Sequence, residues 1–94
     1  MYILITYDVA TTDKEGRRRL RKIAKACKDY GQRVQNSVFE IKIDTKNWLL
    51  LEDRLLSIVN NEEDSIRFYH LDQDVKIENY GYKKPVDFEE PLIL

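Results

Sequence analysis

Met1-Tyr-Ile-Leu-Ile-Thr-Tyr-Asp8 is an apolar run that ends in a carboxylate. Its β-branched and aromatic residues favour a strand, and their density predicts a strand buried in the interior of a sheet. A charge is costly there unless it lies at the strand end, is paired or binds a cation. Because sites form at the carboxyl ends of central strands in sheets flanked by helices, Asp8 is a candidate functional residue. A turn residue or a helix-capping residue is the alternative.

The length and composition indicate one globular domain. The chain has 94 residues, 43% of them hydrophobic and 35% charged, and this leaves no room for a second core. No apolar run approaches about 18 residues, so we expect no membrane span, and the N-terminus does not read as a signal peptide. The single cysteine, Cys27, excludes an internal disulfide. A single cysteine suits a protein of the reducing cytoplasm. Cys27 lies on the apolar face of a predicted helix, so we expect it to be a core residue.

The net charge of −1 conceals an asymmetry along the chain. Residues 1–33 hold nine Lys/Arg against four Asp/Glu, whereas residues 34–94 hold seven against thirteen. A positive local field attracts phosphate even when the whole chain is acidic. The isoelectric point of about 5.8 argues against a protein that coats nucleic acid without regard to sequence.

A helix is predicted after the first strand. Thr12 and Glu15 have the spacing of a capping box, which places the helix start at this point. Apolar residues then recur at three- and four-residue steps, at Leu20, Ile23, Ala24, Cys27 and Tyr30. Gly31 is well placed to end the helix, and Gly16 in its first turn indicates a close approach of a backbone or a ligand.

The remaining chain is predicted to form strands around a second helix. Residues 33–43 alternate as extended chain with a bend at Asn36-Ser37. Thr45 is the expected cap of a leucine-rich helix over residues 46–60, whose broad apolar surface indicates burial on more than one side. Two further strands are predicted over residues 65–71 and 75–80. His70, the one histidine, lies within the first of these and is expected to be a structural or interface residue.

This order predicts a ferredoxin-like α+β fold. A β-α-β-β-α-β sandwich with an additional C-terminal strand places two helices on one face of an antiparallel sheet. The other face stays open, and a second subunit is its expected cover, which gives a two-fold dimer. We assign residues 1–80 to the ferredoxin-like domain and residues 81–94 to a C-terminal tail for partner docking.

Two sets of charged residues are candidates for chemistry. Arg17, Arg18, Arg19 and Arg21 open the first helix, where cations oppose the helix dipole, so helix stability does not explain them. Phosphate binding would explain them, with a solvated basic face as the alternative. The second candidate is the single carboxylate of Asp8. Since Mg²⁺ binds through one or two carboxylates plus substrate phosphates, a dimer that pairs two Asp8 side chains could hold the ion and activate water on a phosphate.

Three stretches resemble a known family, the CRISPR-associated protein two family, which is the small subunit of the CRISPR adaptation module. They are Ile5-Thr-Tyr-Asp8, the arginine-rich first helix and, above all, Gly31-Gln-Arg-Val-Gln-Asn-Ser-Val-Phe-Glu40. The resemblance covers Met1 to about Tyr80. It implies a homodimer of ferredoxin-like subunits in which the late strand of one subunit extends the sheet of the other.

The resemblance also implies site residues and partners. Asp8 is expected to be the metal-binding and catalytic acid that faces its symmetry mate, with Tyr7, Arg33 and Phe39 completing the catalytic site. The arginines of the first helix match the family's basic positions approximately. Members have been described as metal-dependent nucleases acting on single-stranded RNA or double-stranded DNA, and as bridges between dimers of the adaptation integrase.

Two hypotheses therefore stand. In the first, the chain is a Mg²⁺-dependent endonuclease that takes part in the acquisition of new spacers. In the second, it is a non-catalytic homodimeric scaffold that bridges integrase dimers and grips duplex DNA through its arginines. A toxin-like ribonuclease of similar fold does not explain the second motif. The choice between RNA and DNA as substrate stays open.

Overall fold

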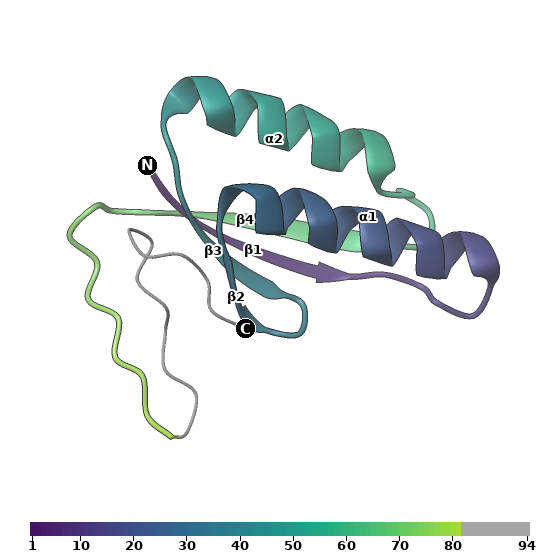
Figure 1. Ribbon diagram of the computed structural model, residues 1–94, viewed down its shortest axis with the longest axis horizontal. Helices are drawn as coiled ribbons and strands as arrows, with labels where there is room; N and C mark the ends of the chain where they lie inside the picture. Colours follow the sequence, from purple (N-terminus) through teal and green to yellow (C-terminus); the bar gives the residue numbers. More distant parts are fainter. Residues whose placement is uncertain (82–94) are drawn as a thin grey trace.

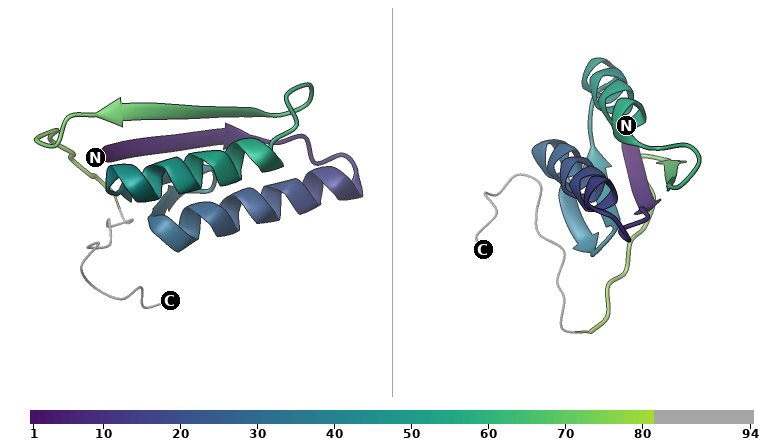
Figure 2. Two further views of the ribbon diagram at one scale, coloured as in Figure 1. Left: turned by 90° about the horizontal axis from the view of Figure 1, so that it is seen from above. Right: turned by 90° about the vertical axis from the view of Figure 1, so that its right-hand side faces the viewer.

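A four-stranded antiparallel sheet with two helices on one face makes up the fold (Figures 1 and 2). The computed structural model describes residues 1–81. The elements are β1 (Tyr2–Asp8), α1 (Lys14–Tyr30), β2 (Gln32–Gln35), β3 (Val38–Lys42), α2 (Thr45–Ile58) and β4 (Ser65–Leu71). The strand order β2-β3-β1-β4 and the β-α-β-β-α-β sequence confirm the predicted ferredoxin-like α+β class. The predicted tail lies, from residue 82 onward, outside the described residues.

Strand β1 lies between β3 and β4, as its composition predicts, but it is buried on one face only. Ile3, Ile5 and Tyr7 are 0–5% exposed beneath the helices, whereas the residues between them are half-buried. The helices cover a single side of the sheet (Figure 2), as predicted, so within one chain the strand is fully buried only on that side.

The core lies between the sheet and the two helices. The sheet contributes Ile3, Ile5, Phe39 and Ile41, α1 contributes Ile23, Ala26 and Cys27, and α2 contributes Trp48, Leu51 and Leu55. The prediction that Cys27 is a core residue is confirmed. Burial raises the pKa of its thiol to about 12, so the thiolate needed for nucleophilic chemistry does not form near neutral pH.

Aspartates, not threonines, cap both helices. Asp13 accepts a hydrogen bond from the backbone N–H of Gly16 at 2.7 Å, and Asp44 accepts one from that of Asn47 at 2.8 Å. The predicted caps, Thr12 and Thr45, are each wrong by one residue. A carboxylate both accepts the hydrogen bond and interacts favourably with the positive end of the helix dipole, so Asp prevails over a neighbouring Thr.

Two glycines permit close packing at the ends of α1. A Cβ on Gly16 would overlap the carbonyl oxygen of Ala10, which confirms the predicted close approach of a backbone. A Cβ on Gly31 would overlap the side chain of Ile41 and the carbonyl oxygen of Glu40. Gly31 ends α1 with an extended φ of −157°, so space against β3, not a left-handed conformation, explains it.

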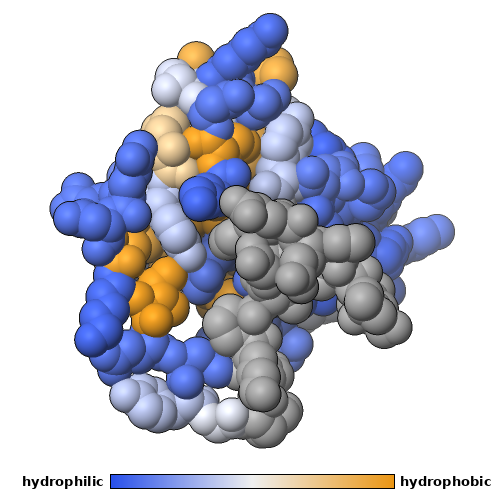
Figure 3. All heavy atoms as spheres, turned by 60° about the vertical axis from the view of Figure 1, so that its left-hand side comes forward, coloured by the Kyte–Doolittle hydropathy of each residue, from blue (hydrophilic) through white to orange (hydrophobic). Residues whose placement is uncertain are grey.

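The surface of α2 is more exposed than its composition indicates. One face of α2 packs into the core, with Trp48, Leu51 and Leu55 buried. Leu49, Leu50 and Leu56 are each more than half exposed, so the predicted burial on further sides is not seen in the described chain. Apolar side chains reach the surface in several separate places on the face shown in Figure 3.

The predicted strand over residues 75–80 does not form. This segment contains no strand, and it leaves β4 through a turn in which Val75 donates to the carbonyl of Asp72. A strand requires a neighbouring edge for its hydrogen bonds, and within residues 1–81 the segment pairs with none. Among residues 1–81, no helix is long and apolar enough to cross a membrane.

Candidate functional site

Asp8 ends the central strand of the sheet with its side chain exposed. Side chains alternate along a strand, so Tyr7 points toward the helices and Asp8 toward the opposite face. The backbone on either side is well held, because Asp8 lies opposite Ser65 of β4 and the following residue, Val9, is only 8% exposed. A carboxylate is thus presented to solvent from a rigid part of the fold.

The fold brings Tyr7, Phe39 and Arg33 together behind this strand end. The rings of Tyr7 and Phe39 are stacked with centroids 6.2 Å apart and an interplanar angle of 22°. Arg33 lies opposite Phe39 in the register of β2 and β3, and its Cζ stands 5.1 Å from the centroid of the Phe39 ring. This cation–π arrangement fixes an exposed positive charge on a buried ring.

Tyr7 is tied to the turn between β2 and β3. Its backbone N–H donates to the carbonyl of Ser37 at 3.1 Å, and its hydroxyl donates to the carbonyl of Asn36 at 3.4 Å. This confirms the predicted bend at Asn36-Ser37. Burial raises the pKa of Tyr7, and the nearby Arg33 guanidinium opposes part of that shift. The phenol therefore stays protonated near neutral pH, which fits a supporting role next to Asp8.

The four arginines of α1 have different surroundings. Arg19 is paired with Asp64 at 2.7 Å and with Glu63 at 3.2 Å, and its side chain is 16% exposed. Arg17 is exposed and donates to the carbonyl of Thr11 at 3.4 Å. Arg18 and Arg21 are exposed and line a hollow between the two helices.

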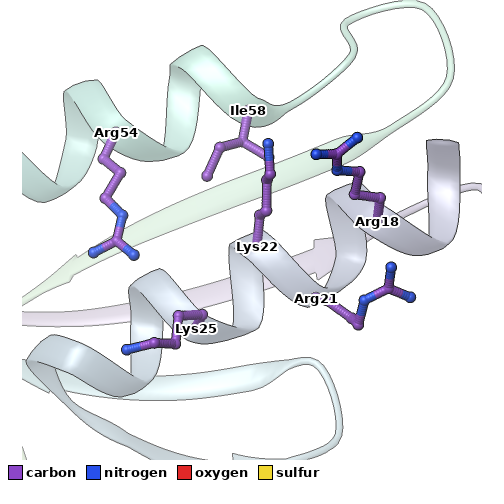
Figure 4. Close-up of a pocket in the computed structure, with 6 residues that line it drawn as sticks. All are labelled: Arg18, Arg21, Lys22, Lys25, Arg54 and Ile58. Atoms are coloured by element: carbon purple, nitrogen blue, oxygen red, sulfur yellow. The ribbon is translucent and has the colours of Figure 1, made fainter.

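That hollow, which we call the interhelical groove, is strongly cationic. It has a volume of about 450 Å³ and is lined by Arg18, Arg21, Lys22, Lys25, Arg54 and Ile58 (Figure 4). Asp29 pairs with Lys25 at 2.6 Å and with Arg54 at 2.9 Å, and these two cations lower the pKa of its carboxyl. No ion pair reaches the other three cations among residues 1–81.

Sequence reasoning missed part of this groove. Lys22 shares a face of the helix with Arg18 by its spacing, and the same rule could have identified Lys25, four residues beyond Arg21. Arg54 belongs to α2, and only the packing of the two helices brings it to the groove. His70 makes an edge-to-face contact with Trp48 at 5.6 Å, in accord with its predicted structural role.

The end of β1 presents the Asp8 carboxylate as a candidate ligand for a metal ion. Within the part of the chain that the structure describes, no three His, Cys, Asp or Glu side chains are grouped closely enough to hold an ion. An exposed carboxylate such as Asp8 is nevertheless the hard oxygen ligand that Mg²⁺ prefers, and Mg²⁺ keeps several waters and binds substrate phosphates. Asp8 therefore fits such an ion as one of several ligands.

Comparisons with known proteins agree with this architecture. The family model for CRISPR associated protein Cas2 matches residues 1–77. The chain is 51% identical to CRISPR-associated endoribonuclease Cas2 3 of Rhodospirillum rubrum, covering 98% of this chain and 99% of that protein. It is 50% identical to CRISPR-associated endonuclease Cas2 of Halalkalibacterium halodurans, covering 99% of each. The crystal structure of Streptococcus pyogenes Cas2 has 50% identity and a TM-score of 0.72, covering 79% of this chain and 89% of that one.

Proposed function

The chain belongs to the Cas2 family of CRISPR-associated proteins, and from this premise we propose that it is an endonuclease of CRISPR adaptation that depends on a divalent cation. Its relatives are named endoribonuclease or endonuclease, which supports phosphodiester hydrolysis and leaves RNA and duplex DNA as candidate substrates. One observation carries the assignment to a site. Asp8 is an exposed carboxylate held at the end of the central strand.

In this proposal the residues around Asp8 have distinct roles. Asp8 would hold the cation, which when bound lowers the pKa of a water ligand and neutralises charge on the scissile phosphate. The packed rings of Tyr7 and Phe39 fix the strand behind Asp8. Arg33, exposed and anchored over Phe39, supplies a positive charge toward phosphate oxygens.

A homodimer is part of the proposal, since a second Asp8 would add the second carboxylate that Mg²⁺ can use. Two observations support it. Strand β4 forms an edge of the described sheet, and the segment 75–80 that follows it in the chain carries the exposed apolar side chains Val75 and Ile77. Open edges readily accept a strand from another chain. The integrase would be a further partner, with residues 81–94 as its proposed docking segment.

Cleavage by wild type and Asp8→Asn tests this function. End-labelled duplex DNA and single-stranded RNA are incubated with and without Mg²⁺. We expect wild type to cut one of them only with Mg²⁺ and Asp8→Asn to lose at least about a hundredfold in rate, because the amide is a poor metal ligand. Asp53→Asn, the same change at an exposed site on α2, is the control and should cut like wild type. Equal cutting by all three proteins would contradict the role of Asp8.

The interhelical groove favours a second function, a scaffold that binds nucleic acid without cutting it. Its five cations come from two helices and surround one apolar residue, so they present several donors to a phosphate backbone. Such contacts position a duplex without reading its sequence. Of the four predicted arginines, Arg18 and Arg21 are the two that line this groove most directly.

Charge removal in the groove tests the scaffold function. Arg18→Gln/Arg21→Gln should weaken duplex binding and reduce the dependence of log K on log salt by about 0.9 for each phosphate that the protein no longer neutralises. Lys28→Gln/Lys46→Gln removes the same charge from exposed sites outside the groove and should leave that slope unchanged. Equal slopes for both double variants would contradict phosphate binding in the groove.

Spacer insertion that survives Asp8→Asn but fails in Arg18→Gln/Arg21→Gln would favour the scaffold over the nuclease.

A further inference from the structure

Asp64 is a carboxylate shielded from solvent at the start of β4. Its side chain is 0% exposed, although it belongs to the polar turn between α2 and β4. An ionised carboxylate that loses its hydration is costly unless it is paired and hydrogen-bonded. The contacts that compensate for this burial therefore show what Asp64 holds together.

Four hydrogen bonds reach its two oxygens. Arg19 donates from Nε to Oδ2 at 2.7 Å and from Nη2 to Oδ1 at 3.2 Å. The backbone N–H of Ala10 donates to Oδ1 at 3.1 Å, and that of Asn60 donates to Oδ2 at 2.9 Å. A two-pronged arginine–carboxylate pair is both strong and geometrically specific. Asp64 thus joins α1, the segment after β1 and the turn after α2.

These contacts enclose the end of β1, where Asp8 lies. Ala10, which Asp64 binds directly, is two residues beyond Asp8 in the chain. Ser65, which follows Asp64, is the partner of Asp8 in the register of β1 and β4. One carboxylate therefore holds the backbone two residues beyond Asp8 and lies next to the residue that faces Asp8 across the sheet, and Arg19 binds that carboxylate from α1.

We propose that Asp64 and Arg19 are positioning residues that fix the end of β1 and thereby the direction of the Asp8 carboxylate. Arg19 acts through this contact and not by binding phosphate, since its guanidinium is already engaged by Asp64 and Glu63 and its side chain is 16% exposed. The catalytic part of this inference rests on the proposed function of Asp8. A displacement of about 1 Å at a reacting group can reduce the rate by about a hundredfold.

The variant Asp64→Asn tests the contact directly. It places an NH₂ group where an acceptor oxygen faces N–H donors, so the bond to Ala10 or to Asn60 is lost. We expect amide hydrogen exchange to become at least about tenfold faster at whichever of Ala10 and Asn60 loses its acceptor. We also expect kcat for Mg²⁺-dependent cleavage to fall about tenfold or more while KM stays within about twofold of wild type. Asp44→Asn is the control, because Asn caps a helix as well as Asp does.

Arg19→Lys separates positioning from phosphate binding. Lysine keeps the positive charge but not the planar fork. If Arg19 positions Asp8, the lysine variant should lose kcat with KM and the salt dependence of binding unchanged. If Arg19 binds phosphate, lysine should preserve kcat, and the change should appear in KM because the two-pronged contact is lost. The second result would overturn the proposal.

Hydrogen exchange keeps this inference separate from the nuclease proposal. If wild type does not cut any substrate, the proposed function fails, and exchange at Ala10 and Asn60 still decides whether Asp64 fixes the strand end. Unchanged exchange at both Ala10 and Asn60 in Asp64→Asn overturns the inference, whatever the activity. Faster exchange with unchanged kcat overturns its catalytic part. If Asp64→Asn does not fold, the same comparison is made with Arg19→Lys.

Discussion

At the scale of single residues, the connection from β1 to α1 leaves no room for a side chain at Gly16. A Cβ there would overlap the carbonyl oxygen of Ala10 and lie 3.0 Å from the cap oxygen of Asp13. Elsewhere in a helix, alanine is more favourable than glycine by about 1 kcal/mol. We expect Gly16→Ala instead to reduce the free energy of unfolding by about 1–3 kcal/mol, as overpacking does, and urea denaturation measures this.

The control for this prediction is Asp53→Ala, which places alanine at an exposed helical position of α2. It should leave stability unchanged within about 0.5 kcal/mol or increase it slightly. A Gly16→Ala variant as stable as wild type would mean that the backbone at Ala10 moves away without cost. The rigid connection after Asp8 would then be contradicted.

The same scale shows which site residues the sequence reveals. Asp8 can be identified because an apolar strand ends there in a charge. Asp64 cannot, since it lies in a polar turn, and its partners Arg19 and Ala10 are 45 and 54 residues away. Helical spacing likewise gives no sign that Arg19 differs from its neighbours, because only the fold places a carboxylate against it.

At the scale of elements, α2 has one buried face and one exposed face. Leu55 is 0% exposed in the core, whereas the next residue, Leu56, is 52% exposed. The same change to alanine should therefore have unequal effects. We expect Leu55→Ala to cost about 2–5 kcal/mol of unfolding free energy because it leaves a cavity, and Leu56→Ala to cost less than about 0.5 kcal/mol. Urea denaturation of both variants at two protein concentrations tests this.

Measuring unfolding at two protein concentrations also defines the result that would contradict this prediction. A large cost for Leu56→Ala that increases with protein concentration would show that a second copy covers the outer face of α2. That result would contradict a single buried face, and it would revive the expectation, drawn from the leucine content, that α2 is enclosed on more than one side.

Elements are predictable from sequence to the extent that they are locally determined. The four strands and two helices follow from hydrophobic period, and they are confirmed. The caps are each displaced by one residue because Thr and Asp stand side by side and only geometry decides between their side chains. The strand expected over residues 75–80 fails for a different reason, since no neighbouring edge is available to it within the described chain.

At the scale of the whole molecule, residues 1–81 leave one face of the sheet and the edge at β4 without a covering element. The helices cover a single face (Figure 2), and β4 forms an edge of seven residues. An uncovered edge of this length is a template for pairing with another chain. The segment over residues 75–80 has the alternating apolar residues that such pairing uses, with Val75 38% and Ile77 46% exposed. Pairing between two chains would explain both the open edge at β4 and the exposed apolar residues of the segment over residues 75–80.

We therefore expect wild type to sediment as a dimer at micromolar concentration and Ile77→Asp to shift toward monomer, because the new carboxylate would be buried against the partner's sheet. Gln73→Asp adds the same charge in the exposed turn before the segment and should sediment like wild type. If cleavage requires an Asp8 from each chain, Ile77→Asp should lose activity at low concentration and regain part of it as concentration increases, while Gln73→Asp stays active throughout. A monomeric wild type, or an Ile77→Asp variant that remains dimeric, would contradict the proposed pairing and leave Asp8 with ligands from one chain only.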